Sequence, residues 1–476
     1  MAQQETQKFS LPTLTAMVIG SMVGAGIFSL PATFGRATGP FGALIAWAIA
    51  ASGMLMLAFV FQTLAQKKPD IDNGVFAYAK VGFGDFLGFC AAFGFWAGTC
   101  LGNVTYFVLI NSTLGLFFPA FGEGNTPFAI LFSSAILWVV HALVLRGVKE
   151  AAFVNTIVTV AKIVPIIVFI GTLIFFFDFG KFVENFWGGG DYSFREVFDQ
   201  VRGTMLVTVF VFIGIEGAAV YSRYAKTREH VGIATVSGFL GVLALMILVT
   251  LLPFGLLDRA QLGAMQQPSM AGVLEAAVGP WGRTFISVGL LVSVLGAYLA
   301  WTLLAAEMMF SGAKGEVMPR MFTRVNANDV PSTALWVTSG LVQLFLLVSV
   351  FASEAFNLSL ALTSAKTLIP YILVAAFALK LAWQAELYDA GSSEHRRDST
   401  IAALATIYTG FMLVAGGLNY VLLSAIIFAP GSILFIVTRL ERGERVFEPF
   451  EWILVAAIWI GAAIGVYGLL TGVITI

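Results

Sequence analysis

Charged side chains are scarce in this sequence. Asp, Glu, Lys and Arg make up 11% of its 476 residues, whereas about 25% is usual for a soluble globular domain. Apolar residues reach 59% and the mean hydropathy is +0.90. These values exclude an ordinary soluble domain, a disordered chain and a secreted disulfide scaffold. The formal net charge is −1, so the basic surface that nucleic acid requires is missing and no nucleic-acid partner is expected.

Cysteine and histidine are also rare, with 2 and 3 copies. Cys90 and Cys100 lie in one apolar stretch, and we expect them to be reduced and packed. The sequence contains no HExxH helix and no GxSxG turn, which are the signatures of common metal-dependent and serine hydrolases. We therefore expect no enzymatic activity, no cofactor and no metal site.

Long apolar runs are what the sequence has in abundance. A membrane-spanning helix needs about 20 largely apolar residues, and about thirteen such runs follow one another with short connectors. They are residues 11–34, 40–64, 86–112, 126–145, 151–177, 203–221, 232–257, 281–311, 333–351, 357–382, 400–416, 418–438 and 451–473. The sequence thus predicts an all-α integral membrane protein whose surroundings are membrane lipid.

The distribution of lysine and arginine predicts the orientation. If the N-terminus is cytoplasmic, most of these residues fall in cytoplasmic connectors, among them Lys67, Arg146 and Arg439. Cytoplasmic connectors of membrane proteins carry such an excess. We therefore expect a multi-pass protein of the cytoplasmic (inner) membrane with its N-terminus in the cytoplasm. An odd number of spans then leaves the C-terminus outside.

Two spans are interrupted by glycine in a similar way. The first contains Val18-Ile-Gly-Ser-Met-Val-Gly-Ala-Gly-Ile-Phe28, and the sixth contains Val209-Phe-Val-Phe-Ile-Gly-Ile-Glu-Gly-Ala-Ala-Val220. They are five spans apart, so they point in opposite directions. Glycine-interrupted spans at matching places in two halves indicate a transporter site at an inverted repeat. The alternative is that these glycines only allow helices to pack closely.

Unwound backbone at the two interruptions would suit a zwitterion. Unwinding at Gly24, Ala25 and Gly26 would free N–H groups at the start of a half-helix, where a carboxylate binds well. Unwinding around Ile213 and Gly214 would free carbonyl oxygens that can accept hydrogen bonds from an ammonium group. An amino acid is the simplest solute that carries both groups.

A few polar or charged residues lie deep within spans, where they are costly. For Glu216 and Lys162 we favour a functional role over a structural one, whereas Glu307 and Lys366 leave the two roles equally open. Several buried carboxylates are compatible with a cationic substrate. Trp301 could bind a cation through its indole face, but from the sequence alone we favour packing in the core. Asn103 could bind a substrate head group or join two helices.

The two interrupted segments also resemble a known family. Gly20-Ser-Met-Val-Gly-Ala-Gly-Ile-Phe-Ser-Leu-Pro31 and Phe212-Ile-Gly-Ile-Glu-Gly217 are similar to the first-span and sixth-span signatures of amino acid–polyamine–organocation transporters. Further stretches, such as Leu145-Arg-Gly-Val-Lys-Glu-Ala-Ala-Phe153, resemble the basic amino acid antiporters. Within that group the resemblance is greatest to the arginine/ornithine exchangers of the arginine deiminase pathway.

The resemblance implies a fold and an activity. The expected fold is leucine-transporter-like, with two inverted five-helix repeats over residues 11–177 and 203–382 and peripheral helices over 400–476, in one transporter domain of residues 1–476. The expected activity is electroneutral, one-for-one exchange of extracellular arginine for intracellular ornithine by alternating access. A homodimer is compatible with this group. Alternatives are exchange involving lysine, histidine/histamine or arginine/agmatine, proton-coupled uptake of a cationic amino acid, and an amino acid sensor.

The resemblance also assigns substrate-binding residues. Gly24, Ala25 and Gly26 match the loop for the carboxylate, and because Ala25 replaces a serine, the carboxylate would depend on backbone donors and Ser21. Ile213 and Gly214 match the carbonyls that receive the α-ammonium group.

Other matches concern the substrate side chain and the gate. The assigned positions are Trp301 under the bound side chain, Asn103 at its guanidinium end, Tyr106 in place of a flexible methionine, and Phe210 in place of a gating tryptophan. Glu216 matches a glutamate linked to gating. Lys162 matches a lysine that occupies the sodium site of some proton-dependent relatives.

Overall fold

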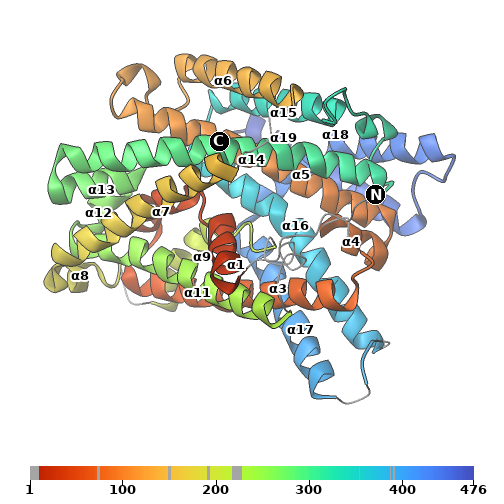
Figure 1. Cartoon of the computed structure of the whole chain (residues 1–476), viewed down its shortest axis with the longest axis horizontal. Helices are drawn as coiled ribbons and strands as arrows, with labels where there is room; N and C mark the ends of the chain where they lie inside the picture. Colours follow the sequence, from red (N-terminus) through yellow and green to blue (C-terminus); the bar gives the residue numbers. More distant parts are fainter. Residues whose placement is uncertain are drawn as a thin grey trace.

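The computed structural model describes residues 10–71, 75–147, 152–189, 193–216, 228–352, 354–385, 387–389 and 392–475. All regular elements in these ranges are helices (Figure 1). The α-helices are α1 (Leu11–Met22), α2 (Leu30–Ala37), α3 (Pro40–Lys67), α4 (Val75–Phe83), α5 (Asp85–Gly115), α6 (Pro127–Leu145), α7 (Ala152–Phe175), α8 (Phe179–Asn185), α9 (Phe194–Phe210), α11 (Arg228–Leu251), α12 (Arg259–Gly263), α13 (Ser269–Val278), α14 (Pro280–Lys314), α15 (Ser332–Ser349), α16 (Ala355–Gln384), α17 (Ser393–Ala415), α18 (Leu418–Arg442) and α19 (Pro449–Leu470). Short 3₁₀ helices are η1 (Ala25–Ser29), η2 (Pro119–Phe121), η4 (Leu252–Gly255) and η5 (Arg320–Thr323).

The prediction of an all-α membrane protein is confirmed. Within the described ranges, 11 helices are long and apolar enough to cross a membrane, and the bent pair formed by α1 with η1 and α2 raises the number to 12. The sixth predicted span, 203–221, coincides with the second half of α9 and a turn that is described as far as Glu216. Its remaining residues lie outside the described part, so the count of about thirteen stays a prediction.

The helices begin where local sequence allows it. Proline occupies the first position of α3, α6, α14 and α19, where its missing N–H costs nothing and its fixed φ suits a helix. The Thr126 hydroxyl also accepts a hydrogen bond from the Ala129 N–H at 3.2 Å, which caps α6. Their apolar side chains suit the long helices to the membrane interior, where the hydrogen bonds within each helix pair most of its backbone polar groups.

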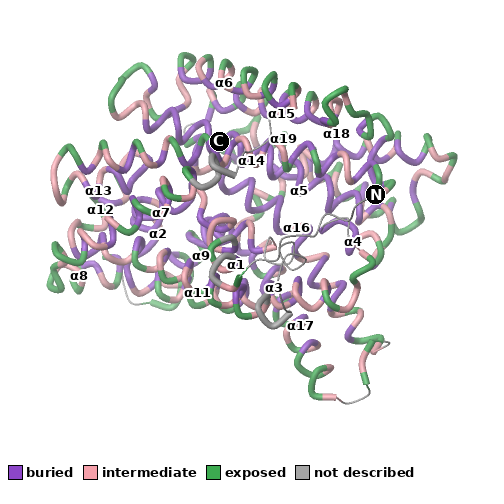
Figure 2. Tube along the Cα trace, viewed as in Figure 1, coloured by how far each residue is buried: buried purple, intermediate pink, exposed green. Residues whose placement is uncertain are grey.

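Burial distinguishes central from peripheral helices (Figure 2). The most apolar stretch of α5 is 100% buried within the protein, whereas that of α19 is only 22% buried. The corresponding stretch of α16 is 78% buried and α16 packs along α5, so these two helices lie at the centre of the molecule. Apolar side chains on α19 such as Ile453, Trp459 and Leu470 are exposed and are suited to lipid contact.

Lys366 joins the central helix α16 to the peripheral helix α18. Its side chain is fully buried, its Nζ donates to the Ser424 carbonyl at 2.8 Å, and the ammonium lies 4.2 Å from the centre of the Phe428 ring. These contacts account for Lys366 as a helix–helix link. Glu307, by contrast, is exposed on α14 and accepts a hydrogen bond from the Ser311 hydroxyl.

Candidate functional site

The first interruption is a true break in the helix. Helix α1 ends at Met22, Gly24 is extended with φ −113° and ψ −159°, and the chain resumes as η1 and α2. The two parts of this span meet at 50°. No side chain caps the start of η1, and the first N–H groups of a helix have no partner within it. The break therefore presents backbone donors to an anionic group.

The second interruption follows α9. The helix ends at Phe210, and a turn continues to Glu216 with Gly214 at φ +107°. L-residues with a side chain rarely adopt this conformation. Among the described residues, no backbone hydrogen bond ends on the carbonyl oxygens of Ile213 or Gly214. These two oxygens can therefore accept hydrogen bonds from an ammonium group.

The two breaks touch each other. A Cβ atom added to Gly214 would lie 2.3 Å from the Ser21 carbonyl oxygen, and one added to Gly26 would lie 2.7 Å from the Phe210 ring. Only glycine permits such close approach of one backbone to the other. The structure thus brings together the predicted residues of the first and sixth spans. Backbone donors and acceptors are combined in one small region.

Lys162 and Ser21 both contact the helical part before the first break. The Lys162 Nζ, on α7, donates to the Gly20 carbonyl at 2.8 Å. An ammonium group is thus held at the C-terminal end of α1, where the helix dipole favours positive charge. The Ser21 hydroxyl donates to the Val18 carbonyl at 2.8 Å. Its single hydrogen is therefore already used within α1.

Glu216 links the second break to α16. Its Oε2 accepts hydrogen bonds from the Gly214 N–H at 3.1 Å and from the Tyr371 hydroxyl at 2.6 Å. Tyr371 is fully buried and its ring lies edge-on to Phe61 of α3, at 5.8 Å between centroids. Sequence analysis missed Tyr371. A tyrosine after Pro370 within a long apolar helix was the only signal, and it does not identify a partner.

Replacing Tyr371 with phenylalanine tests this link. The variant Tyr371→Phe keeps the ring contact with Phe61 but leaves Glu216 with one hydrogen bond fewer. We expect the maximal exchange rate to fall by about ten- to hundredfold, because a hydrogen bond to a charged group is worth about 1.5–3 kcal/mol. Initial rates of uptake into proteoliposomes over a range of substrate concentrations measure it. An unaltered rate would show that the contact does not influence transport.

A second group of predicted residues lies on α5 and α14. The Asn103 Nδ2 is 3.4 Å from the Thr302 hydroxyl, while its Oδ1 is buried without a hydrogen-bond partner. The neighbouring Trp301 packs over Gly102, where an added Cβ would lie 2.5 Å from the indole. Tyr106 meets Trp301 edge-on, with 5.4 Å between ring centroids and 69° between ring planes. Two aromatic rings in contact, and an amide on the same helix as Tyr106, thus come from α5 and α14.

Tyr106 connects this group to the first break. Its hydroxyl oxygen lies 3.8 Å from the position of a Cβ atom on Gly24. The predicted carboxylate loop and the predicted side-chain pocket are therefore neighbours. Such an arrangement can hold an amino acid by its carboxylate at one end and by a cationic side chain at the other, through an amide oxygen and aromatic faces.

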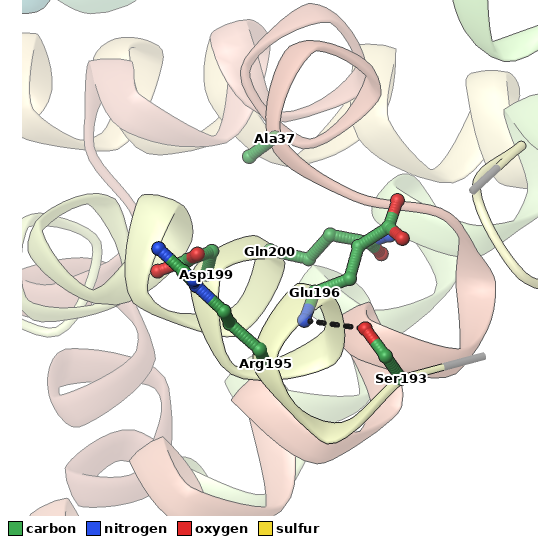
Figure 3. A pocket seen from close by; sticks show the side chains of 6 residues that line it. All are labelled: Ala37, Ser193, Arg195, Glu196, Asp199 and Gln200. Carbon is green, nitrogen blue, oxygen red and sulfur yellow. Dashed lines mark hydrogen bonds between the residues drawn. The ribbon is translucent and has the colours of Figure 1, made fainter. Parts of the chain in front are cut away.

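One surface pocket among the described residues lies away from these groups. It has a volume of about 410 Å³ and lies at the start of α9, where the Ser193 hydroxyl accepts a hydrogen bond from the Glu196 N–H (Figure 3). Its lining consists of Ala37, Ser193, Arg195, Glu196, Asp199 and Gln200. None of the predicted substrate-binding residues is among them.

Apolar membrane helices that enclose two touching helix breaks are the architecture of a secondary transporter. Comparison with known proteins agrees, because residues 9–438 match the amino acid permease family. The chain belongs to that family. It is a multi-pass membrane transporter and not an enzyme, as the sequence predicted.

Three relatives within this range of transporters have substrates or exchange partners in their names. The chain is 50% identical, over 100% of both sequences, to an arginine/ornithine antiporter of Pseudomonas aeruginosa. It is 40% identical to an L-lysine transport protein of Corynebacterium glutamicum, over 99% of this chain and 97% of the relative. It is 39% identical to an arginine/agmatine antiporter of Chlamydia pneumoniae, over 89% of this chain and 88% of the relative.

Proposed function

We propose that this protein exchanges extracellular arginine for intracellular ornithine. The 50% identity to an arginine/ornithine antiporter over the whole chain supports this pair. The observation that carries the proposal is the buried Oδ1 of Asn103, which has no partner among the described residues, next in sequence to Gly102, on which Trp301 packs. A buried acceptor without a partner costs free energy, and a guanidinium or ammonium group would satisfy it.

The proposed binding mode distributes the substrate over both breaks. The carboxylate binds the N–H groups of Gly24, Ala25 and Gly26, and the α-ammonium group binds the carbonyls of Ile213 and Gly214. The side chain extends between Trp301 and Asn103. Phe210 covers the bound substrate as an aromatic gate, because its ring already packs against the first break.

Exchange would proceed by alternating access of two inverted five-helix repeats, residues 11–177 and 203–382. Residues 400–476 are peripheral in this scheme. Lys162 would stabilise the end of α1 with a fixed positive charge, in place of a bound sodium ion. Glu216 would couple the second break to α16 through Tyr371. The N-terminus would be cytoplasmic, in the cytoplasmic membrane, and the C-terminus outside.

One-for-one exchange would be electroneutral. Arginine and ornithine each carry one net positive charge at neutral pH, since both side chains remain protonated. The two concentration gradients would then drive exchange without a contribution from the membrane potential. Exchange of arginine for agmatine, which lacks the carboxylate, would move net charge.

Counterflow into liposomes tests the proposal. Purified protein is reconstituted into vesicles that contain ornithine, lysine, agmatine, histamine or buffer, and uptake of radiolabelled arginine is followed with and without an imposed membrane potential. We expect rapid uptake with ornithine inside, independent of the potential, and little with buffer inside. Faster uptake with agmatine or lysine inside would contradict the arginine/ornithine pair and identify the other solute as the exchange partner. Uptake into buffer-loaded vesicles under an imposed proton gradient would contradict exchange and indicate proton-coupled uptake.

A further inference from the structure

Tyr106 occupies a position between the two ends of the proposed substrate. It lies on α5 one turn after Asn103, its side chain is 2% exposed, and its ring rests edge-on against Trp301. Its hydroxyl oxygen is 3.8 Å from the position of a Cβ atom on Gly24. The aromatic ring therefore faces the side-chain end of the site while the hydroxyl group faces the first break.

The hydroxyl group has no hydrogen-bond partner among the residues that the structure describes. The Tyr408 hydroxyl, for comparison, is a phenol oxygen that is enclosed without a partner among the described residues. The Tyr106 hydroxyl oxygen, by contrast, is not fully enclosed, although the residue is only 2% exposed. A phenol in such a place has one hydrogen to donate.

Two serine hydroxyl groups near the break already donate hydrogen bonds to backbone carbonyls. The Ser21 hydroxyl donates to the Val18 carbonyl at 2.8 Å, and the Ser29 hydroxyl donates to the Gly26 carbonyl at 2.7 Å. Ala25 has no hydroxyl. Each serine has a single hydrogen, so neither can donate to a substrate while it holds its backbone partner. Of these three hydroxyl groups, only that of Tyr106 has no partner among the described residues.

We propose that the Tyr106 hydroxyl donates a hydrogen bond to the α-carboxylate of the substrate and so makes the protein select amino acids over the corresponding decarboxylated amines. This inference rests on the proposed function, because it places the carboxylate at Gly24–Gly26. In this inference Tyr106, rather than Ser21, is the side chain that assists the backbone donors.

The protein would select amino acids because a decarboxylated amine has no carboxylate to accept a hydrogen bond from the Tyr106 hydroxyl. With arginine bound, the phenol pairs with a charged oxygen. With agmatine bound, the same group is shielded from water and has no acceptor. Sites built to hydrogen-bond one substrate group reject analogues that lack it, and a single hydrogen bond to a charged group corresponds to about a ten- to hundredfold difference in affinity.

The test is a ratio of two inhibition constants. Uptake of labelled arginine into ornithine-loaded proteoliposomes is inhibited by unlabelled arginine and, separately, by agmatine, for the wild type and for Tyr106→Phe. We expect the constant for arginine to rise about ten- to hundredfold in the variant while that for agmatine changes little. The ratio between the two constants then collapses.

Tyr408→Phe is the matched control. Tyr408 is also a buried tyrosine with an unpartnered hydroxyl, but it lies on α17 and packs against Gly53 of α3, apart from both breaks. We expect this variant to keep the wild-type ratio. If Tyr106→Phe shifts both inhibition constants equally, or shifts neither, the hydroxyl does not hydrogen-bond the carboxylate and the inference is overturned.

Failure of the proposed function has a different signature. A wild-type protein that does not exchange arginine for ornithine contradicts the function regardless of any variant. The ratio is then measured for the pair that is transported, such as lysine against cadaverine or histidine against histamine. Loss of that ratio in Tyr106→Phe supports the inference, and its retention contradicts it.

Discussion

Substitution of Gly214 by alanine is expected to reduce arginine uptake to the level of empty vesicles. The residue has φ +107°, a conformation that costs other L-residues about 1–2 kcal/mol. Its added methyl group would also lie 2.3 Å from the Ser21 carbonyl oxygen, so the two breaks could no longer touch. Uptake into ornithine-loaded proteoliposomes measures the loss, and gel filtration confirms that the variant is folded.

Gly417→Ala separates backbone strain from the close contact. Gly417 has φ +99°, and no atom lies within 4 Å of its added Cβ. It joins α17 to α18, away from both breaks. We expect this variant to retain most of its transport activity at a modest loss of stability. Equal inactivation of both variants would mean that strain alone, and not the contact between breaks, explains the effect at Gly214.

Asn103→Leu should weaken arginine binding by about ten- to hundredfold. Leucine has a similar volume but offers no acceptor, so the cationic end of the substrate would lose its partner in a buried site. Because the Oδ1 has no partner among the described residues, we expect the substitution to cost the substrate-free protein little stability. Isothermal titration of arginine into detergent-solubilised protein measures the affinity directly.

Thr302→Val serves as the comparison for Asn103→Leu. Thr302 is the group that meets the amide nitrogen of Asn103, at 3.4 Å, so valine would free the amide to rotate without removing its oxygen. We expect a loss of affinity of only a few-fold. If Asn103→Leu binds arginine as tightly as the wild type, Asn103 is a link between α5 and α14 and the substrate side chain lies elsewhere.

The two breaks could be predicted from the sequence because glycine is conspicuous inside an apolar span. Gly24, Gly26 and Gly214 occur where a continuous helix would disfavour them, and the structure gives each a reason in extended backbone, close contact or positive φ. The apolar runs predicted the helices for an equally direct reason. In a membrane, length and composition alone decide which segments cross.

The side-chain partnerships could not be predicted in the same way. The sequence does not show that the Ser21 hydroxyl donates to the Val18 carbonyl, or that Glu216 accepts from Tyr371. Such pairings depend on rotamers and on helices distant in the chain. Lys366 is the clearest case. Its partner, the Ser424 carbonyl, is a backbone atom, and a backbone atom leaves no trace in residue identity.

The contact of Lys366 has a consequence for how the protein is made. During synthesis α16 enters the membrane before α18 exists, and until α18 arrives the lysine has neither its carbonyl acceptor nor its aromatic cover. An unpaired lysine at the centre of a bilayer costs about 3 kcal/mol or more. Insertion of α16 is thus completed by a helix that follows later in translation. In a chain that stops before α18, Lys366 would lack both the Ser424 carbonyl and the Phe428 ring, so we expect such a chain to insert α16 less stably.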